Sequence, residues 1–125
     1  MSQPATDDPT QLSCCEPAAH ELTESEVAAD LDALTALSNE TRYEALRVIA
    51  AADEGRCVCE IEPALGVSQG AVSQALSRLF AAGLVTRRKE GRWRYYAATP
   101  RAHRLLDELD AIRADVESNG GKRDE

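Results

Sequence analysis

Four cysteines in two close pairs are the residues of this chain with the most distinctive chemistry. Cys14 and Cys15 are adjacent, and Cys57 and Cys59 are separated by one residue. Two structural disulfides are one interpretation, but a bond between adjacent cysteines closes a strained ring, and a reducing cytosol keeps thiols free. We therefore expect free thiols, which bind soft ions and metalloids such as As(III), Sb(III), Cd(II), Pb(II), Zn(II) or Cu(I).

The second pair, Cys57 and Cys59, lies at the predicted start of a short helix. Free N–H groups of the first turn, together with Arg56, are expected to favour thiolate there. On a regular helix, side chains at i and i+2 point in widely different directions. Both sulfurs are therefore expected to hold one ion only if the first turn of the helix is unwound.

Charge is distributed very unevenly along the chain. Its net charge is −8, yet the segment from Arg78 to Arg104 carries +7, which leaves −15 on the remainder. A basic patch on an acidic body is typical of nucleic-acid binding. Only Lys89 and Lys122 of the basic residues are lysines. This composition resembles that of proteins from salt-rich cytoplasms, although a high-GC codon bias predicts it equally well.

Hydrophobic periodicity and turn residues predict the elements that position these groups. Residues 1–22 form a polar tail, and Thr23 with Glu26 has the spacing of a capping box. Helices are expected over about 23–37, 39–52, 58–65, 69–82 and 100–117, and a hairpin over 84–97 with its turn at Glu90-Gly91. The apolar stripes of the first, fourth and last helices are Val27, Leu31, Leu34 and Leu37; Val72, Ala75, Leu76 and Leu79; and Leu105, Leu106, Leu109, Ile112 and Val116.

Two helices joined by Gly66-Val67-Ser68 and followed by a basic hairpin predict a winged helix-turn-helix. Val67 is expected to pack inward. The fold class is mainly α (α+β), with about five helices and a two-stranded wing. We expect one DNA-binding and dimerisation domain over residues 23–117, between a flexible N-terminal tail at 1–22 and a polar C-terminal tail at 118–125.

The fourth helix and the wing supply the expected DNA contacts. Gln pairs with adenine in the major groove, Ser with several bases, and Arg or Lys with phosphates or the minor groove. A solvated edge hairpin protected by charge is the alternative for the wing. The candidate residues are Ser68, Gln69, Gly70, Ser73, Gln74, Ser77, Arg78, Arg87, Arg88, Lys89, Arg92 and Arg94.

Residues 37–96 resemble the ArsR–SmtB family of metal-responsive repressors. The resemblance rests on Leu37-Ser38-Asn39-Glu40-Thr41-Arg42, Cys57-Val58-Cys59-Glu60-Ile61, the run from Val67 to Leu76, Ala82-Gly83-Leu84-Val85, and Gly91-Arg92-Trp93-Arg94-Tyr95-Tyr96. It implies a homodimer that leaves its double-stranded operator when metal binds, with the first and last helices in the dimer interface.

Two positions depart from the family pattern. Ala75 stands where members often have His, and Glu62 stands where the arsenic-sensing pattern often has a third cysteine. A pyramidal As(III) site takes three sulfurs, so we expect Cys14 or Cys15 to supply the third, unless both are incidental tail residues. The expected inducer is As(III) or Sb(III), with Cd(II), Pb(II) or Zn(II) as alternatives. A zinc site at His103 and Asp107, or with His20 in the tail, is less favoured.

Other functions remain open. Cys57 and Cys59 could be oxidised rather than metallated in a redox-sensing repressor, or the winged helix could bind an acidic protein. An enzyme is not expected, because no anion loop surrounds a nucleophilic cysteine. We expect a cytoplasmic protein that has neither a secretory signal nor a membrane span, and that binds no small organic substrate.

Overall fold

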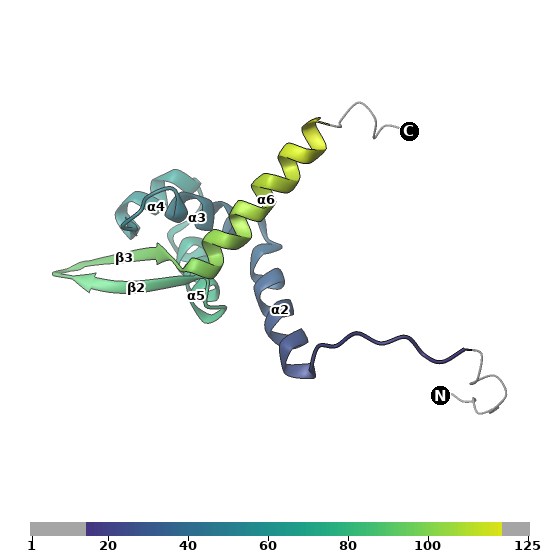
Figure 1. Cartoon of the computed structure of the whole chain (residues 1–125). Helices are drawn as coiled ribbons and strands as arrows, with labels where there is room; N and C mark the ends of the chain where they lie inside the picture. The colour runs from purple at the N-terminus through teal and green to yellow at the C-terminus, as the bar shows by residue number, and fades with distance from the viewer. Residues whose placement is uncertain (1–14, 119–125) are drawn as a thin grey trace.

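The computed structural model describes residues 15–118. In chain order the elements are α2 (Glu24–Leu37), α3 (Glu40–Ala50), β1 (Arg56–Cys57), α4 (Val58–Leu65), α5 (Gln69–Ala81), β2 (Val85–Glu90), β3 (Trp93–Ala98) and α6 (Pro100–Ser118). The wing hairpin projects from one side of the body, and α2 and α6 extend away from the other (Figure 1). This arrangement is the predicted winged helix-turn-helix.

Polar side chains begin the helices where the sequence predicts. The Thr23 hydroxyl accepts a hydrogen bond from the Glu26 amide at 3.1 Å, and the Glu26 carboxylate accepts one from the Thr23 amide at 2.9 Å. Asn39 caps α3 and Ser68 caps α5 in the same way. Each cap satisfies an N–H group that the helix itself leaves unpaired. The predicted starts of these helices are therefore confirmed.

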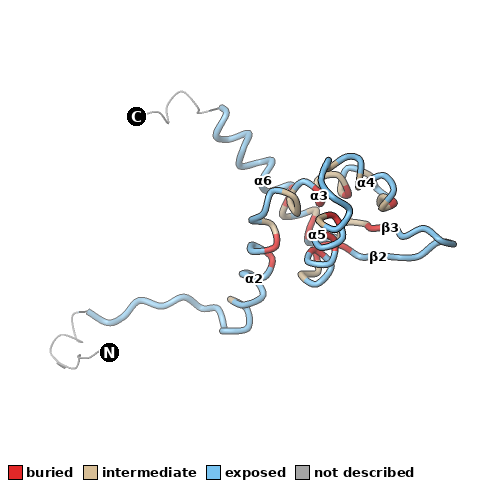
Figure 2. Tube along the Cα trace, turned by 180° about the vertical axis from the view of Figure 1, so that it is seen from behind, coloured by how far each residue is buried: buried red, intermediate tan, exposed pale blue. Residues whose placement is uncertain are grey.

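The core lies between α3, α4, α5 and the base of the sheet, and the end of α2 and the start of α6 close it (Figure 2). The four predicted apolar positions of α5, Val72, Ala75, Leu76 and Leu79, are all buried. The prediction for Val67 is wrong, because its side chain is 39% exposed. Val67 lies in the short turn between α4 and α5, outside the regular helices whose periodicity identifies a buried face.

A three-stranded antiparallel sheet has the order β1-β3-β2. The predicted hairpin is β2–β3, and β1 joins it by pairing Arg56 with Tyr96 and Cys57 with Tyr95. Sequence patterning missed β1 because two residues show no alternation. Gly55 precedes β1 at φ +94°, and a Cβ there would lie 2.6 Å from the Tyr96 carbonyl oxygen. Only glycine permits this approach.

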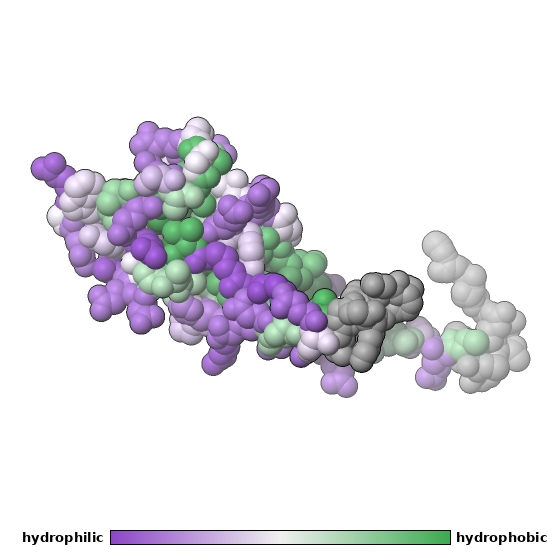
Figure 3. Space-filling model, turned by 90° about the horizontal axis from the view of Figure 1, so that it is seen from above, coloured by the Kyte–Doolittle hydropathy of each residue, from purple (hydrophilic) through white to green (hydrophobic). Residues whose placement is uncertain are grey.

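The apolar side chains of α2 and α6 lie mostly outside the core. Leu31 and Leu34 of α2 are 54% and 57% exposed, whereas Ala33 and Ala36 are buried. On α6, Leu106 is buried but Ile112 is 50% exposed. Seen from above, apolar patches interrupt the hydrophilic surface (Figure 3). No helix within residues 15–118 combines the length and the apolar character that a membrane crossing requires.

Candidate DNA-binding face and dithiol site

The predicted base-reading side chains share one exposed face. Gln69, Ser73, Gln74 and Ser77 are all exposed on α5, and so are Ser68, Gly70 and Arg78. A hollow of about 610 Å³ runs beside this face and is lined by α5 and by the start of α3. The face is therefore open along its length, as a helix that enters a DNA groove must be.

Arg42 borders the same hollow, but its guanidinium belongs to the scaffold. Its Nε donates to the Ala36 carbonyl oxygen at 2.7 Å and its Nη2 to that of Thr35 at 3.0 Å. These carbonyls lie in the last turn of α2, where the helix leaves carbonyls unpaired, and that of Thr35 also accepts from the Ser38 amide and hydroxyl. Arg42 thus ties α2 to α3. Sequence analysis quoted Arg42 within a motif but assigned it no role.

The basic residues of the wing fall into two groups. Arg88 donates to the Glu90 carboxylate at 2.7 Å and to the Glu54 carbonyl oxygen at 3.3 Å, and Arg87 stacks 4.0 Å from the Phe80 ring centroid. Lys89, Arg92 and Arg94 make no side-chain hydrogen bond or ion pair within residues 15–118. Their charged groups are therefore unpaired within the described residues, whereas those of Arg87 and Arg88 contact other parts of the chain.

Cys57 and Cys59 come together without any unwinding of the helix. Cys57 is the N-cap of α4, with extended backbone at φ −72° and ψ 146°, so it lies before the first helical residue. Its buried sulfur accepts a hydrogen bond from the Cys59 amide at 3.3 Å, and its own amide donates to the Glu60 carboxylate at 3.0 Å. We expected the first turn to unwind because we assumed regular helix at both cysteines. Cys57 instead precedes the helix, so that assumption is wrong.

The thiol form is favoured at Cys59. Hydrogen bonding to the Cys57 side chain, followed by burial and the nearby charge of Glu60, raises the pKa of the Cys59 thiol. Arg56, which was expected to favour thiolate, uses its Nε to donate to the Val48 carbonyl oxygen at 3.1 Å, and its effect on the two thiols stays a prediction. Arg56 therefore secures the end of α3.

The dithiol site is in direct contact with the DNA-binding elements. Cys57 is hydrogen-bonded through β1 to β3 of the wing. Cys59 lines a hollow of about 380 Å³ whose other walls include Gln69 of α5 and Arg94 of β3. The two cysteines are thus separated from α5 and from the wing by at most one layer of side chains.

Of the other predicted ligands, those within the described residues do not join this pair. Cys15 is exposed, on a segment that leads away from α4 (Figure 1), and Cys14 lies outside the described residues. Between residues 15 and 118, no cluster of three His, Cys, Asp or Glu side chains could hold a metal ion. His103 and Asp107 on α6 therefore lack a third ligand, and His20 accepts a hydrogen bond from the Leu22 amide.

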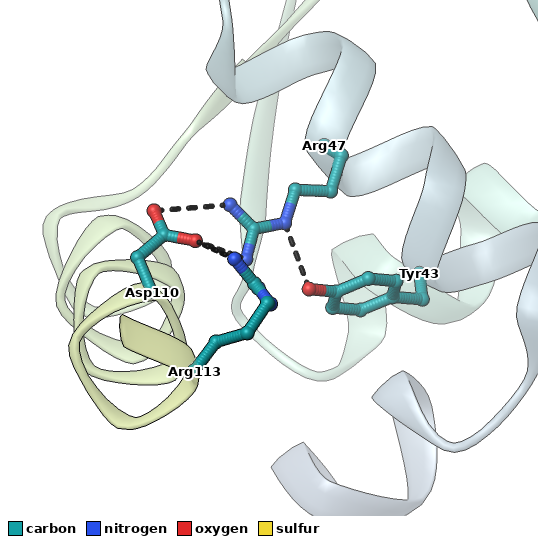
Figure 4. A network of polar contacts seen from close by, with 4 residues as sticks. All are labelled: Tyr43, Arg47, Asp110 and Arg113. Atoms are coloured by element: carbon teal, nitrogen blue, oxygen red, sulfur yellow. Dashed lines mark hydrogen bonds and ion pairs between the residues drawn. The ribbon is translucent and has the colours of Figure 1, made fainter. Parts of the chain in front are cut away.

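A polar network joins α3 to α6 (Figure 4). Arg47 donates to both carboxylate oxygens of Asp110, at 3.4 and 3.0 Å, and Arg113 contributes a third contact at 3.1 Å. Arg47 also donates to the Tyr43 hydroxyl at 2.8 Å. Hydrogen bonds from Arg47 and then Arg113 lower the pKa of Asp110. The network therefore connects the middle of α6 to α3.

Known proteins are similar to this chain in sequence and in fold. Residues 39–87 match the arsR family of bacterial regulatory proteins. The chain is 56% identical over 104 residues, 83% of its length and 87% of the relative's, to a Halobacterium salinarum protein named "Putative arsenical resistance operon repressor ArsR2". It is 37% identical to the Pseudomonas putida arsenic resistance transcriptional regulator ArsR2, over 62% of this chain and 67% of that protein.

Solved structures of other proteins have a similar fold. HlyU from Vibrio cholerae superposes with a TM-score of 0.65 at 28% identity, covering 72% of this chain and 97% of HlyU. The homodimeric winged helix-turn-helix DNA-binding domain of Mb0332 from Mycobacterium bovis superposes with a TM-score of 0.67 at 26% identity, covering 79% and 93%. This chain is a winged-helix protein, and it belongs to the arsR family of bacterial regulatory proteins.

Proposed function

We propose that this protein is a cytoplasmic, homodimeric repressor that leaves its operator when arsenite or antimonite binds Cys57 and Cys59. The observation that carries the proposal is the position of the dithiol, at the N-cap of α4 and on a strand paired with the wing. The names of the relatives, which refer to arsenical resistance, support the choice of metalloid. Cd(II), Pb(II) and Zn(II) are the alternative inducers, and the absence of enzymatic activity stays a prediction.

The proposed dimer forms through α2 and α6. Their exposed leucines, isoleucine and valine leave an apolar surface that one chain does not cover. A groove of about 370 Å³, lined by Ala33, Leu34 and Leu105 among others, lies between the two helices. Mb0332, which shares the fold, is homodimeric. A two-fold dimer would place two copies of α5 in successive major grooves, about one helical turn apart.

DNA binding is tested with a palindromic duplex that the wild-type protein selects from a random library. Arg92→Ala and Arg94→Ala should weaken binding to every sequence and lower the salt slope by about one, because each removes a phosphate contact. Gln69→Ala and Gln74→Ala should change the preferred bases. Arg88→Ala should weaken binding less than Arg92→Ala or Arg94→Ala, because Arg88 already has protein partners. Unchanged binding by all four variants would reject the DNA-binding face.

Two neutral thiols suffice for the proposed sensing reaction. Arsenous acid, As(OH)₃, exchanges two hydroxyl groups for the two sulfurs, and each thiol proton leaves with a hydroxyl as water. Arsenic stays trivalent throughout, so no oxidant or reductant is needed. The new As–S bonds replace the hydrogen bond that the Cys59 amide donates to the Cys57 sulfur. We propose that this displaces β1 and, through it, the wing.

Cysteine double variants test the sensor. Cys57→Ser/Cys59→Ser should bind DNA normally and no longer be released by arsenite. Cys14→Ser/Cys15→Ser should weaken arsenite binding and leave DNA affinity unchanged, if the tail supplies the third sulfur. Release of the first variant by arsenite would reject the proposed sensor site. Unchanged arsenite affinity in the second would identify the tail cysteines as bystanders.

Redox sensing is the second candidate, since the Cys57 sulfur lies within hydrogen-bond distance of the Cys59 backbone amide and both cysteines are free thiols. Treating the reduced protein with hydrogen peroxide or with arsenite distinguishes the two functions. We expect release by arsenite under conditions in which all four thiols can be recovered. Release by peroxide alone would favour the redox function.

A further inference from the structure

Trp93, the only tryptophan of the chain, is a large side chain that the wing leaves half exposed. It is the first residue of β3 and directly follows the hairpin turn. Its indole makes no hydrogen bond or ring contact within residues 15–118, so the N–H donor is unused there. A single exposed apolar side chain is common on protein surfaces, and the surroundings of Trp93 must therefore decide whether it has a partner.

The surroundings of Trp93 connect the wing with the reading helix. Trp93 lines the hollow of about 380 Å³ together with Arg92 and Arg94 of the wing and with Gln69 and Ser73 of α5. With α5 in a major groove, the wing lies over the edge of that groove. The part of a duplex that separates a major groove from the neighbouring minor groove is one sugar–phosphate strand. The hollow therefore lies where that strand has to pass.

We propose that one sugar–phosphate strand of the operator runs through this hollow and that the Trp93 indole packs against its deoxyribose rings. This inference rests on the proposed DNA binding by α5 and the wing. Arg92 and Arg94 then lie beside phosphates of the strand, and the indole N–H is available to a phosphate oxygen. Contacts of this kind fix the position of a protein on the duplex without reading its sequence.

The charges that line the hollow fit a polyanionic strand. Arg92 and Arg94 contribute two positive charges, and neither has an ion-pair partner in the described part of the chain. Glu62 of α4 is the one acidic residue of the lining, which leaves the lining with a net positive charge. The Glu62 carboxylate therefore faces the same space as the strand and opposes its binding. This opposition provides a second way to test what occupies the hollow.

The fluorescence of the protein reports on Trp93 alone, because the chain has no other tryptophan. The palindromic duplex selected by the wild-type protein is added to the full-length reduced protein. We expect the acrylamide quenching constant of the emission to fall several-fold, because the strand covers the exposed half of the ring. Acrylamide is uncharged, so the charge of DNA does not control its access. An equal quenching constant with and without bound duplex would overturn the inference.

Substitution of Trp93 separates a sugar contact from a phosphate or base contact. Trp93→Ala should weaken binding by about tenfold, or about 1.4 kcal/mol, and equally for every sequence. The salt slope should be unchanged because no charge is lost, whereas Arg92→Ala should lower it by about one. Trp93→Phe should retain most of the affinity because it keeps a ring. A loss that depends on the base step would place the indole between bases and overturn its packing on the strand.

Two further variants test the place of the strand. Glu62→Gln should tighten binding by about two- to threefold at low salt, and the gain should vanish at high salt, which screens the carboxylate. Binding no tighter than that of the wild type would place the strand outside the hollow. Leu22→Ala removes a side chain of similar exposure that precedes α2, on the other side of the body from the wing (Figure 1), and should leave binding unchanged.

Failure of this inference and failure of the proposed function give different results. Full affinity of Trp93→Ala together with weakened binding by Arg92→Ala would overturn the role of Trp93 and leave DNA binding intact. A wild-type protein that selects no duplex from the library would overturn the proposed function itself. Equal urea midpoints for Trp93→Ala and the wild type establish that a loss of affinity does not come from unfolding.

Discussion

The apolar face of α5 and those of α2 and α6 look alike in the sequence and end in different surroundings. On α5, Val72, Ala75, Leu76 and Leu79 are buried in the chain's own core. On α2, the comparable leucines lie in solvent while the alanines beside them are buried. Periodicity thus identifies the face of a helix that needs a partner, but it does not say whether that partner belongs to the same chain.

The largest effect is expected for a cavity in the α5 region. Leu79→Ala removes a side chain that is fully buried. Truncation of a buried leucine costs about 2–5 kcal/mol, because transfer free energy is lost and a cavity remains. We expect the free energy of unfolding, measured by urea denaturation, to fall by this amount. Leu31→Ala on α2 is the matched control, and an equal loss there at concentrations where the protein is monomeric would remove the contrast between the two regions.

Truncation in the proposed dimer interface should affect dimerisation rather than the stability of the single chain. Ile112→Ala should leave the unfolding of the monomer nearly unchanged, because the side chain is half exposed in one chain. It should weaken dimerisation by about 1–2 kcal/mol, or roughly tenfold in Kd, if the side chain is buried between two copies. Sedimentation equilibrium measures the Kd. Dimerisation as tight as that of the wild type would place Ile112 outside the interface.

Salt should strengthen dimerisation through α2 and α6 more than it stabilises the core around α5. Helix α2 carries Glu24, Glu26, Asp30 and Asp32 and no basic residue, so pairing two copies brings like charges together. The Debye length shrinks to about 3 Å at 1 M salt, which screens this repulsion. We expect the dimer Kd to fall as KCl rises from low to molar concentration, with a smaller gain in monomer stability. A Kd that rises with KCl would contradict the acidic interface.

Features that depend on neighbouring residues in the chain could be predicted from the sequence, whereas features that depend on distant contacts could not. Caps at Thr23, Asn39 and Ser68 and the buried face of α5 follow from local chemistry, which a sequence displays directly. The strand β1 does not, because it exists only where β3 comes back alongside it. The orientations of Cys57 and Arg56 likewise depend on the backbone that surrounds them. The thiols themselves could be identified from residue type and spacing. The hydrogen bond from the Cys59 amide to the Cys57 sulfur and the hollow beside Cys59 depend on the folded backbone.

The smallest effect is expected where the two regions meet, at Asp110. Its carboxylate accepts hydrogen bonds from Arg47 of α3 and Arg113 of α6, and these partners are substantially exposed. Exposed ion pairs contribute little to stability. We therefore expect Asp110→Asn to lower the unfolding free energy only slightly, and to act mainly on the angle of α6 and hence on dimerisation.

The pH dependence of this contact has a defined sign. The pKa of Asp110 is lowered in the folded chain, first by Arg47 and then by Arg113. The contribution of the carboxylate is therefore fully present above its unfolded pKa and is lost as the pH falls through its folded pKa. Wild type and Asp110→Asn should differ in dimer Kd at neutral pH and converge in acid, where Asp110 is protonated. A difference that persists undiminished in acid would show that the carboxylate charge does not set the angle of α6.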